Sequence, residues 1–289
     1  MEHMEFQYRV LITGSNSYVG GSLEQWLSRY EDRYLIDTVS TFDNAWEKID
    51  FGVYDTVVHV GAIVHRQETP GMERLYREVN RDLAIRIATR ARDQGVRQFI
   101  LMSTMSVYGK LQGVIDNSTP LLPGTLYGTS KLEAERGILP LQSDRFDVVV
   151  LRPPMIYGKG AKGNYLRLSR LARECPVFPE FDNSRSMLYI DNLCEFVRLM
   201  IENREKGVFH PQNKEYVNTS DMVKYIAEVH GRRIRMTTAL NPVIRLLISR
   251  NNTFSKVFGT LVYDKGMSEY KSDYWYVADL RRSIELTEA

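Results

Sequence analysis

The sequence predicts an α/β protein with a doubly wound parallel sheet and a smaller lobe after it. Apolar runs at residues 9–12, 56–60, 98–103 and 146–151 alternate with segments of helical pattern. Strands that are apolar throughout and alternate with helices are typical of a parallel sheet covered on both faces. After residue 152 strands become scarce and loops more frequent, so we expect domains at 1–154 and 155–289.

The remaining elements of the first domain follow from local patterns. A β-rich run at residues 34–40 predicts a second strand, and residues 45–49 predict a short helix. Residues 75–94 form a long helical pattern that Gly95 ends, and residues 127–137 suit another helix.

Composition excludes several classes of protein. The 289 residues are 43% apolar and 26% charged, with a net charge of +2, which is ordinary for a globular chain and excludes a strongly basic nucleic-acid binder. No apolar run reaches the length of a membrane span, and the polar start, Met1 to Glu5, is unlike a signal peptide. The two cysteines, Cys175 and Cys194, and five scattered histidines lack metal-ligand spacing. We expect a cytoplasmic protein with no metal, nucleic acid or membrane partner.

The turn after the first strand has the pattern Gly14-x-x-Ser17-x-x-Gly20 and leads into a helix. A helix N-terminus offers unpaired N–H groups and a positive dipole, which suit a pyrophosphate, and glycines let the backbone approach it closely. An ordinary β–α turn is the alternative, and the position after the first strand favours the phosphate site of a Rossmann-type fold.

A tyrosine and a lysine, Tyr127 and Lys131, lie at i and i+4 on one face of the predicted helix. A nearby cation lowers the pKa of a phenol and prepares it for proton transfer to or from an alcohol. Most isolated YxxxK patterns are surface residues. Here Ser103 and Thr104 follow a buried strand, at the sheet edge where open α/β sheets bind ligands, although strand-end capping also explains them.

In this order, the motifs resemble those of the extended short-chain dehydrogenase/reductase family, and within it the sugar-nucleotide epimerase/dehydratase group. The likeness covers roughly Arg9 to Leu286. Its motifs, in the family's order, are TGxxxxVG, VxHVGA, Val79-Asn80, SxxSVYG, YGxSK, LRPPxIYG and RxxxYIDN. The resemblance implies a bound dinucleotide, a nucleotide-diphosphate sugar as substrate, a homodimer formed through two helices, and a role in polysaccharide biosynthesis.

The resemblance also implies roles for single residues. Thr104, Tyr127 and Lys131 would be catalytic, with Lys131 binding the nicotinamide ribose and lowering the pKa of Tyr127. Thr104, Asn164 and Arg185 would contact the substrate. The cofactor would be held by Gly14, Asn16, Ser17, Tyr18, Val19, Gly20, Ser40, Thr41, Val60, Gly61, Ala62, Asn80, Ser103, Tyr127, Lys131 and Pro153.

Three departures from the family pattern qualify these expectations. Ser17 replaces a usual glycine. The 34 residues between Gly20 and Asp55 leave the sheet one strand short, or merge its second and third strands. The acidic residue that normally ends the second strand is missing, since Asp37 lies within the strand and Asp43 beyond its end. NAD or NADP therefore remains open, with NAD favoured.

The family's dehydratases carry an Asp-Glu pair after the catalytic threonine, where this chain has Met105-Ser106. We therefore expect a sugar-nucleotide 4-epimerase that acts at C4 of a UDP-linked hexose by transient oxidation, with Tyr127 as acid and base. The alternatives are a 4-keto reductase that consumes NAD(P)H, and an inactive dinucleotide-binding protein.

Overall fold

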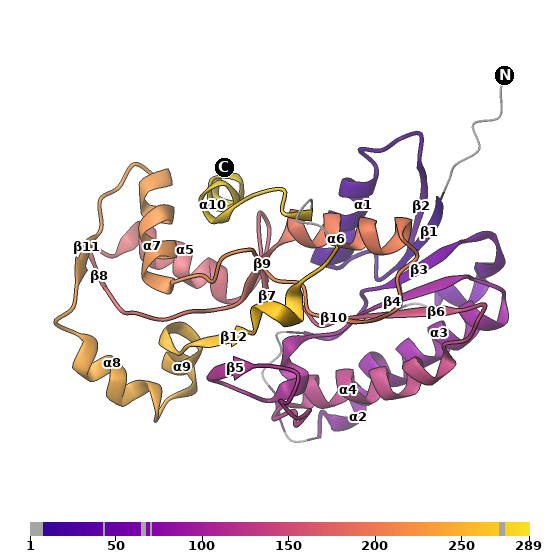
Figure 1. Cartoon of the computed structure of the whole chain (residues 1–289), viewed down its shortest axis with the longest axis horizontal. Coiled ribbons are helices and arrows are strands. Elements are labelled where there is room, and N and C mark those ends of the chain that lie inside the picture. The colour runs from indigo at the N-terminus through magenta and orange to yellow at the C-terminus, as the bar shows by residue number, and fades with distance from the viewer. Residues whose placement is uncertain (1–7, 43, 65–67, 70, 272–274) are drawn as a thin grey trace. The chain divides into compact units, whose positions relative to one another are not determined.

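A computed structural model describes residues 8–42, 44–64, 68–69, 71–271 and 275–289, and the chain divides into two compact units (Figure 1). The first comprises Met1–Gly109, Leu121–Pro153 and Leu193–His210, and the second comprises Lys110–Pro120, Pro154–Asn192 and Pro211–Ala289. The expected boundary after residue 154 adjoins one junction between the units. The chain also returns to the first unit at Leu193–His210, because that segment supplies the last strand of its sheet.

The first unit contains a six-stranded sheet in the order β10-β6-β4-β3-β1-β2, and every neighbouring pair is parallel. The strand order reverses between β1 and β3, which confirms the doubly wound α/β fold. In open sheets of this kind the crevice at such a reversal is the usual ligand site. The strands are β1 (Tyr8–Thr13), β2 (Tyr34–Val39), β3 (Thr56–His59), β4 (Gln98–Met102), β6 (Asp147–Leu151) and β10 (Gly207–Phe209).

Helices cover both faces of this sheet. Figure 1 shows α1 and α6 on one side and α3 and α4 on the other. The predicted helix at 75–94 is a composite, in which α2 and α3 flank a π-helical turn at Arg77–Asp82. The helices are α1 (Tyr18–Leu27), α2 (Glu73–Tyr76), α3 (Leu83–Asp93), α4 (Leu126–Ile138) and α6 (Ile190–Glu202).

The connection from β2 to β3 explains the short spacing in the sequence. Two 3₁₀ turns, Ala45–Lys48 and Phe51–Val53, replace a second crossover, and within the described residues the sheet ends at β2. Trp46 and Phe51 bury their rings in the apolar core that α3 and the sheet share, at 2% and 0% exposure. The sheet is therefore one strand short, and β2 and β3 are separate strands on opposite sides of β1.

The described residues of the second unit form three two-stranded parallel sheets with helices between them. The pairs are β5 (Gly113–Ile115) with β12 (Leu261–Tyr263), β7 (Met155–Tyr157) with β9 (Met187–Tyr189), and β8 (Val177–Pro179) with β11 (Arg235–Thr237). The helices are α5 (Asn164–Glu174), α7 (Thr219–Val229), α8 (Asn241–Ile248), α9 (Asn252–Phe258) and α10 (Leu280–Glu288).

Across the described part of the chain, no helix combines the length and the apolar character that crossing a bilayer requires.

We expect Phe99→Ala to lower the free energy of unfolding by about 3–5 kcal/mol, because it opens a cavity in the middle of the sheet. Phe99 is fully buried on β4, with its ring centroid 6.4 Å from that of Phe146. Urea unfolding would measure the loss, with Val53→Ala as the control at a position that is 47% exposed. Equal stabilities of the two variants would contradict this account of the core.

Candidate functional site

The turn after β1 is built from glycines that no larger residue could replace. Gly14 has φ +108°, and a Cβ there would lie 2.6 Å from the backbone nitrogen of Gly61. A Cβ on Gly20 would lie 2.8 Å from the carbonyl oxygen of Gly14. The turn therefore lies against both the start of α1 and the loop after β3, and both glycines are required by backbone contact.

Ser17 fits the turn without distorting it. Its φ of −88° and ψ of 151° are open to any residue, so glycine is not needed there. Its hydroxyl oxygen accepts a hydrogen bond from the backbone N–H of Gly20 at 3.0 Å and so caps α1. The departure from the family pattern at this position leaves the turn intact.

A pocket of about 170 Å³ opens where β1, β2 and β3 end. Of the predicted cofactor residues, seven line it, and the lining also includes Ser15 and Phe42, which the sequence analysis did not single out. None of the described lining side chains is charged. Asp37 lies within β2, where its carboxylate accepts a hydrogen bond from the Tyr54 hydroxyl, and Asp43 lies outside the described residues. The predicted residues in the lining are Gly14, Asn16, Ser17, Ser40, Thr41, Gly61 and Ala62.

The other predicted cofactor residues lie around this turn and the neighbouring strand ends. Tyr18, Val19 and Gly20 form the first turn of α1. Val60 follows β3 directly and is 7% exposed. Pro153 follows β6, and its carbonyl oxygen accepts from the backbone N–H of Met105 at 2.9 Å.

Two hydroxyl groups meet at the end of β4. Thr104 is 8% exposed and caps the 3₁₀ turn Met105–Tyr108, where its Oγ1 accepts from the backbone N–H of Ser106 at 3.2 Å. Tyr127, in the first turn of α4, has Thr104 among the polar neighbours that act on its phenol. The structure thus brings together the two predicted proton-handling residues from segments 23 positions apart.

Burial raises the pKa of the Tyr127 phenol to about 12, while the Thr104 hydrogen bond acts in the opposite direction. The neighbouring Tyr76 adds to the rise. Desolvation outweighs the effect of Thr104, and Lys131 is not among the causes of the shift, so its effect on the pKa of Tyr127 stays a prediction.

Lys131 is 1% exposed, and its Nζ donates to the carbonyl oxygen of Met102 at 2.8 Å. Burial lowers its pKa to about 8, and Glu135, one turn further along α4, opposes the change. The ammonium is thus held at the end of β4 by Met102, which precedes Thr104 by two residues.

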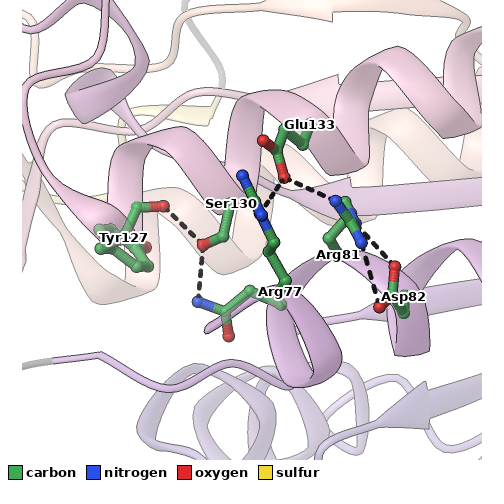
Figure 2. A network of polar contacts seen from close by, with 7 residues as sticks. Arg77, Arg81, Asp82, Tyr127, Ser130 and Glu133 are labelled. Carbon is green, nitrogen blue, oxygen red and sulfur yellow. Dashed lines mark hydrogen bonds and ion pairs between the residues drawn. The ribbon is translucent and has the colours of Figure 1, made fainter. Parts of the chain in front are cut away.

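Asn80 connects α4 to the loop after β3 and is fully buried in the π-helical turn. Its amide oxygen accepts from the backbone N–H of Ile63 at 2.7 Å, and its amide nitrogen donates to Ser130 Oγ at 3.1 Å. Ser130 in turn donates to the carbonyl oxygen of Tyr127 at 2.9 Å, as Figure 2 shows. Asn80 therefore supports the helix that carries the tyrosine, rather than a strand alone.

The same π-helical turn also forms ion pairs with α4. Glu133 of α4 accepts from Arg81 Nη1 at 3.0 Å and lies 3.5 Å from Arg77 Nε (Figure 2). Arg81 also pairs with Asp82 at 2.6 Å. These contacts lie on the side of α4 that faces the turn, so the π-helical segment and α4 form one unit.

A buried ion pair lies beneath the end of β4. Arg152 Nη2 donates to Glu135 Oε2 at 2.6 Å, and the side chains are 9% and 1% exposed. Ser103 Oγ donates to the same carboxylate, and Arg152 Nη1 donates to the Tyr108 hydroxyl at 2.9 Å. Glu135 of α4 is thus bonded to Ser103, which precedes Thr104, and to Arg152, which precedes Pro153.

Sequence reasoning missed two acidic residues of this helix environment. Glu135 was detectable, since it follows Lys131 at i+4 on the same helix face. Glu68 was not, because its carboxylate accepts from the backbone N–H groups of Leu126 and Tyr127, 58 and 59 positions away, at 3.0 and 3.1 Å. A carboxylate at the N-terminus of α4 is favoured by the helix dipole.

The predicted substrate residues Asn164 and Arg185 belong to the second unit. Asn164 is the exposed first residue of α5. Arg185 Nη1 donates to the carbonyl oxygens of Gly259 at 2.8 Å and Ser255 at 3.4 Å. Burial lowers the pKa of Arg185 to about 10, so the guanidinium stays charged at neutral pH.

Within the described residues, no group of three or more His, Cys, Asp and Glu side chains is placed to hold a metal ion.

Comparison with known proteins relates this arrangement to one family. The sequence model of the "NAD dependent epimerase/dehydratase family" matches residues 10–216. A UDP-glucose 4-epimerase of Vibrio cholerae is 30% identical over 249 residues, which are 75% of this chain and 74% of that protein. An N-acetyl-alpha-D-glucosaminyl-diphospho-ditrans,octacis-undecaprenol 4-epimerase of Escherichia coli O157:H7 is 27% identical over 63% of this chain and 56% of that protein.

Solved structures agree at the level of the fold. The structure of a UDP-glucuronic acid 4-epimerase from Bacillus cereus in complex with NAD superposes with a TM-score of 0.71. The alignment covers 97% of this chain and 95% of that one at 17% identity.

We expect Glu135→Gln to cost about 3–5 kcal/mol of unfolding free energy, because the Arg152 guanidinium would remain buried without a counter-charge. Glu133→Gln, on the same helix but 26% exposed, is the matched control and should cost about 1 kcal/mol or less. Chemical unfolding of both variants would measure the difference. Similar losses of unfolding free energy in the two variants would show that the buried pair contributes no more to stability than the exposed one.

The lowered pKa of Lys131 predicts a pH-dependent stability. Between a folded pKa of about 8 and a model value of 10.5, the unfolded chain binds more protons than the folded one. The unfolding free energy of the parent should therefore rise with pH across this window relative to Lys131→Met, by up to about 3 kcal/mol. Unfolding curves of both proteins at several pH values would measure this, with exposed Lys224→Met as the control. A difference that stays flat or falls would contradict the burial of a titrating ammonium.

Proposed function

Because the chain belongs to the NAD dependent epimerase/dehydratase family, we propose that it is a 4-epimerase of nucleotide-diphosphate sugars that uses bound NAD. The observation that carries the proposal is the grouping of the Tyr127 phenol with Thr104, which acts to lower its pKa, and with the Lys131 ammonium, which is bonded to Met102 at the end of β4. A phenol and a hydroxyl in contact can pass a proton to and from a carbinol.

The pocket at the ends of β1, β2 and β3 suits the dinucleotide. Gly14 and Gly20 leave no Cβ in the turn, and the start of α1 presents backbone N–H groups and a positive dipole to a pyrophosphate. Ser40 and Thr41 supply uncharged hydroxyls after β2, where a ribose would lie. Among the described residues, the pocket lining contains no arginine or lysine to bind a 2′-phosphate, which supports NAD over NADP.

In the proposed reaction Tyr127 Oη takes the proton of the sugar hydroxyl and later returns it. Thr104, which acts to lower the pKa of Tyr127, would stabilise the charge that develops on Tyr127 Oη. When bound, oxidised nicotinamide supplies a hydride acceptor and a positive charge, which the phenol needs because its pKa is about 12 in the protein alone. Lys131 adds a second cation, held in place by the carbonyl of Met102.

The residues after Thr104 favour epimerisation over dehydration. Met105 and Ser106 follow it, and the backbone N–H of Ser106 bonds to Thr104 Oγ1, so no carboxylate occupies the position of the dehydratase acids. The Vibrio and Escherichia relatives are both named as 4-epimerases of diphosphate-linked sugars. A 4-keto reductase and an inactive dinucleotide-binding protein are the alternatives that the experiment below separates.

Arg185 supports recognition of the sugar's diphosphate. In the part of the chain that the structure describes, its hydrogen bonds use Nη1 alone, which leaves Nε and Nη2 as donors for phosphate oxygens. Asn164, at the exposed start of α5, is the second residue we assign to the substrate.

We also propose a cytoplasmic homodimer that serves polysaccharide biosynthesis. The support is the family resemblance, together with the packing of α3 on α4, the helices of the expected dimer face. Ala88 and Leu132 on these helices are buried within the chain, so they would not supply that face. Light scattering of the purified protein would decide the oligomeric state.

Tyr127→Phe should lower kcat for UDP-glucose/UDP-galactose interconversion by about 10²–10⁴-fold while the fold is retained, because it removes only the proton-transfer oxygen. Tyr54→Phe is the matched control, since it removes a phenol hydroxyl that bonds the exposed side chain of Asp37, a residue without a proposed role in proton transfer. Melting curves would verify that both variants fold. Activity of Tyr127→Phe at the level of the parent would overturn the proposal.

Cofactor released from the purified protein, identified by mass, separates the alternatives. An epimerase should retain NAD and turn over without net oxidation of NADH or NADPH, because hydride returns to the substrate. Stoichiometric oxidation of added NAD(P)H would instead establish the reductase, and failure to bind either dinucleotide would establish neither enzyme.

A further inference from the structure

Six cationic residues form an unusual segment of the second unit. Between Glu228 and Asp264 the sequence carries five arginines and one lysine but no aspartate or glutamate. All six side chains are exposed. None of them makes an ion pair with an acidic side chain among the described residues. The residues are Arg232, Arg233, Arg235, Arg245, Arg250 and Lys256.

Most arginines of the first unit, by contrast, form ion pairs. Ten of them pair with carboxylates, from the surface pair of Arg74 with Glu78 to the buried pair of Arg152 with Glu135. Unpaired positive charge on this segment is therefore a local property and does not follow from the overall charge of +2. The ten are Arg33, Arg74, Arg77, Arg81, Arg86, Arg92, Arg97, Arg152, Arg198 and Arg204.

Apolar side chains project from the same segment. Leu240, the N-cap residue of α8, and Val243 and Leu246 within the helix are 47%, 55% and 52% exposed. The helix is anchored by Ile244, which is 4% exposed, and by its packing on α9. Figure 1 shows α8 and α9 side by side in the second unit. An anchored helix with three exposed aliphatic side chains would gain by covering them.

We propose that this α8 surface, defined as Leu240, Val243, Arg245, Leu246 and Arg250, docks on an anionic phospholipid membrane. Aliphatic side chains on one helix face would enter the boundary between headgroups and acyl chains, and the neighbouring arginines would meet lipid phosphates. Charge complementarity selects this occupant, because no carboxylate lies between Glu228 and Asp264 to repel an anionic surface. Glu180 lies by the start of α8, where its backbone carbonyl oxygen accepts a hydrogen bond from the Asn241 side chain.

A nucleic acid is a poorer match for this surface. Phosphate backbones are bound by cations and polar groups, and Val243 and Leu246 between the arginines would make no favourable contact with them. The proposal revises the expectation that the protein has no membrane partner, since that expectation considered only spanning segments. It concerns a surface apart from the residues assigned to catalysis and holds whether or not the chain is an epimerase.

Flotation of the full chain with vesicles tests the proposal. The probes are vesicles of phosphatidylcholine alone and of equal parts phosphatidylcholine and phosphatidylglycerol. We expect a partition coefficient at least about ten-fold higher on the anionic vesicles, falling as salt is raised. Val243→Ser with Leu246→Ser, and separately Arg245→Glu with Arg250→Glu, should each reduce it at least about ten-fold, because binding needs both insertion and charge.

Val53→Ser with Arg145→Glu is the matched control, since it removes one exposed aliphatic side chain and one exposed arginine from the first unit. The control should partition as the parent does, and melting curves of all variants should coincide. Equal binding to neutral and anionic vesicles would overturn the proposal. So would a serine double variant that binds like the parent, because binding would then be electrostatic alone, as to a nucleic acid.

Discussion

The position of α4 is the constraint on which the candidate site depends. This helix carries Tyr127 and Lys131, and each of its sides is fixed by a different partner. Glu68 bonds its first backbone N–H groups, and Asn80 holds Ser130. Glu135 joins its inner face to Arg152 beneath the sheet end. Because these contacts point in different directions, α4 cannot slide or rotate without breaking several of them.

The cofactor pocket depends on close backbone approach. The turn after β1 lies against the loop after β3, and Gly14 and Gly61 touch where any Cβ would collide. This packing survives the loss of a strand, because β2 and β3 flank β1 directly and the 3₁₀ turns between them fill the core with Trp46 and Phe51. The family's phosphate turn thus needs only three strands around it.

The two units use charge differently. In the first, ion pairs connect helices to one another and to the sheet, as Arg81 with Glu133 and Arg198 with Glu202 illustrate. The second unit also has such pairs, as Arg281 with Glu228 shows, but the arginines between Glu228 and Asp264 are exposed and pair with no acidic side chain among the described residues. Paired charges add specificity to packing, whereas unpaired charges beside exposed aliphatic side chains are available to an external surface.

The sequence by itself predicted the parallel sheet, the family and the residues of the phosphate turn, and it left open whether a strand is missing or two strands are merged. These follow from apolar runs, glycine spacing and motif order, which are local in the chain. Only the tertiary structure decided that Ser17 caps α1, that Glu68 bonds α4 from 58 positions away, and that Leu193–His210 returns to the sheet. It also decided that the pKa of Tyr127 rises, because desolvation depends on what surrounds a side chain in space and leaves no trace in local sequence.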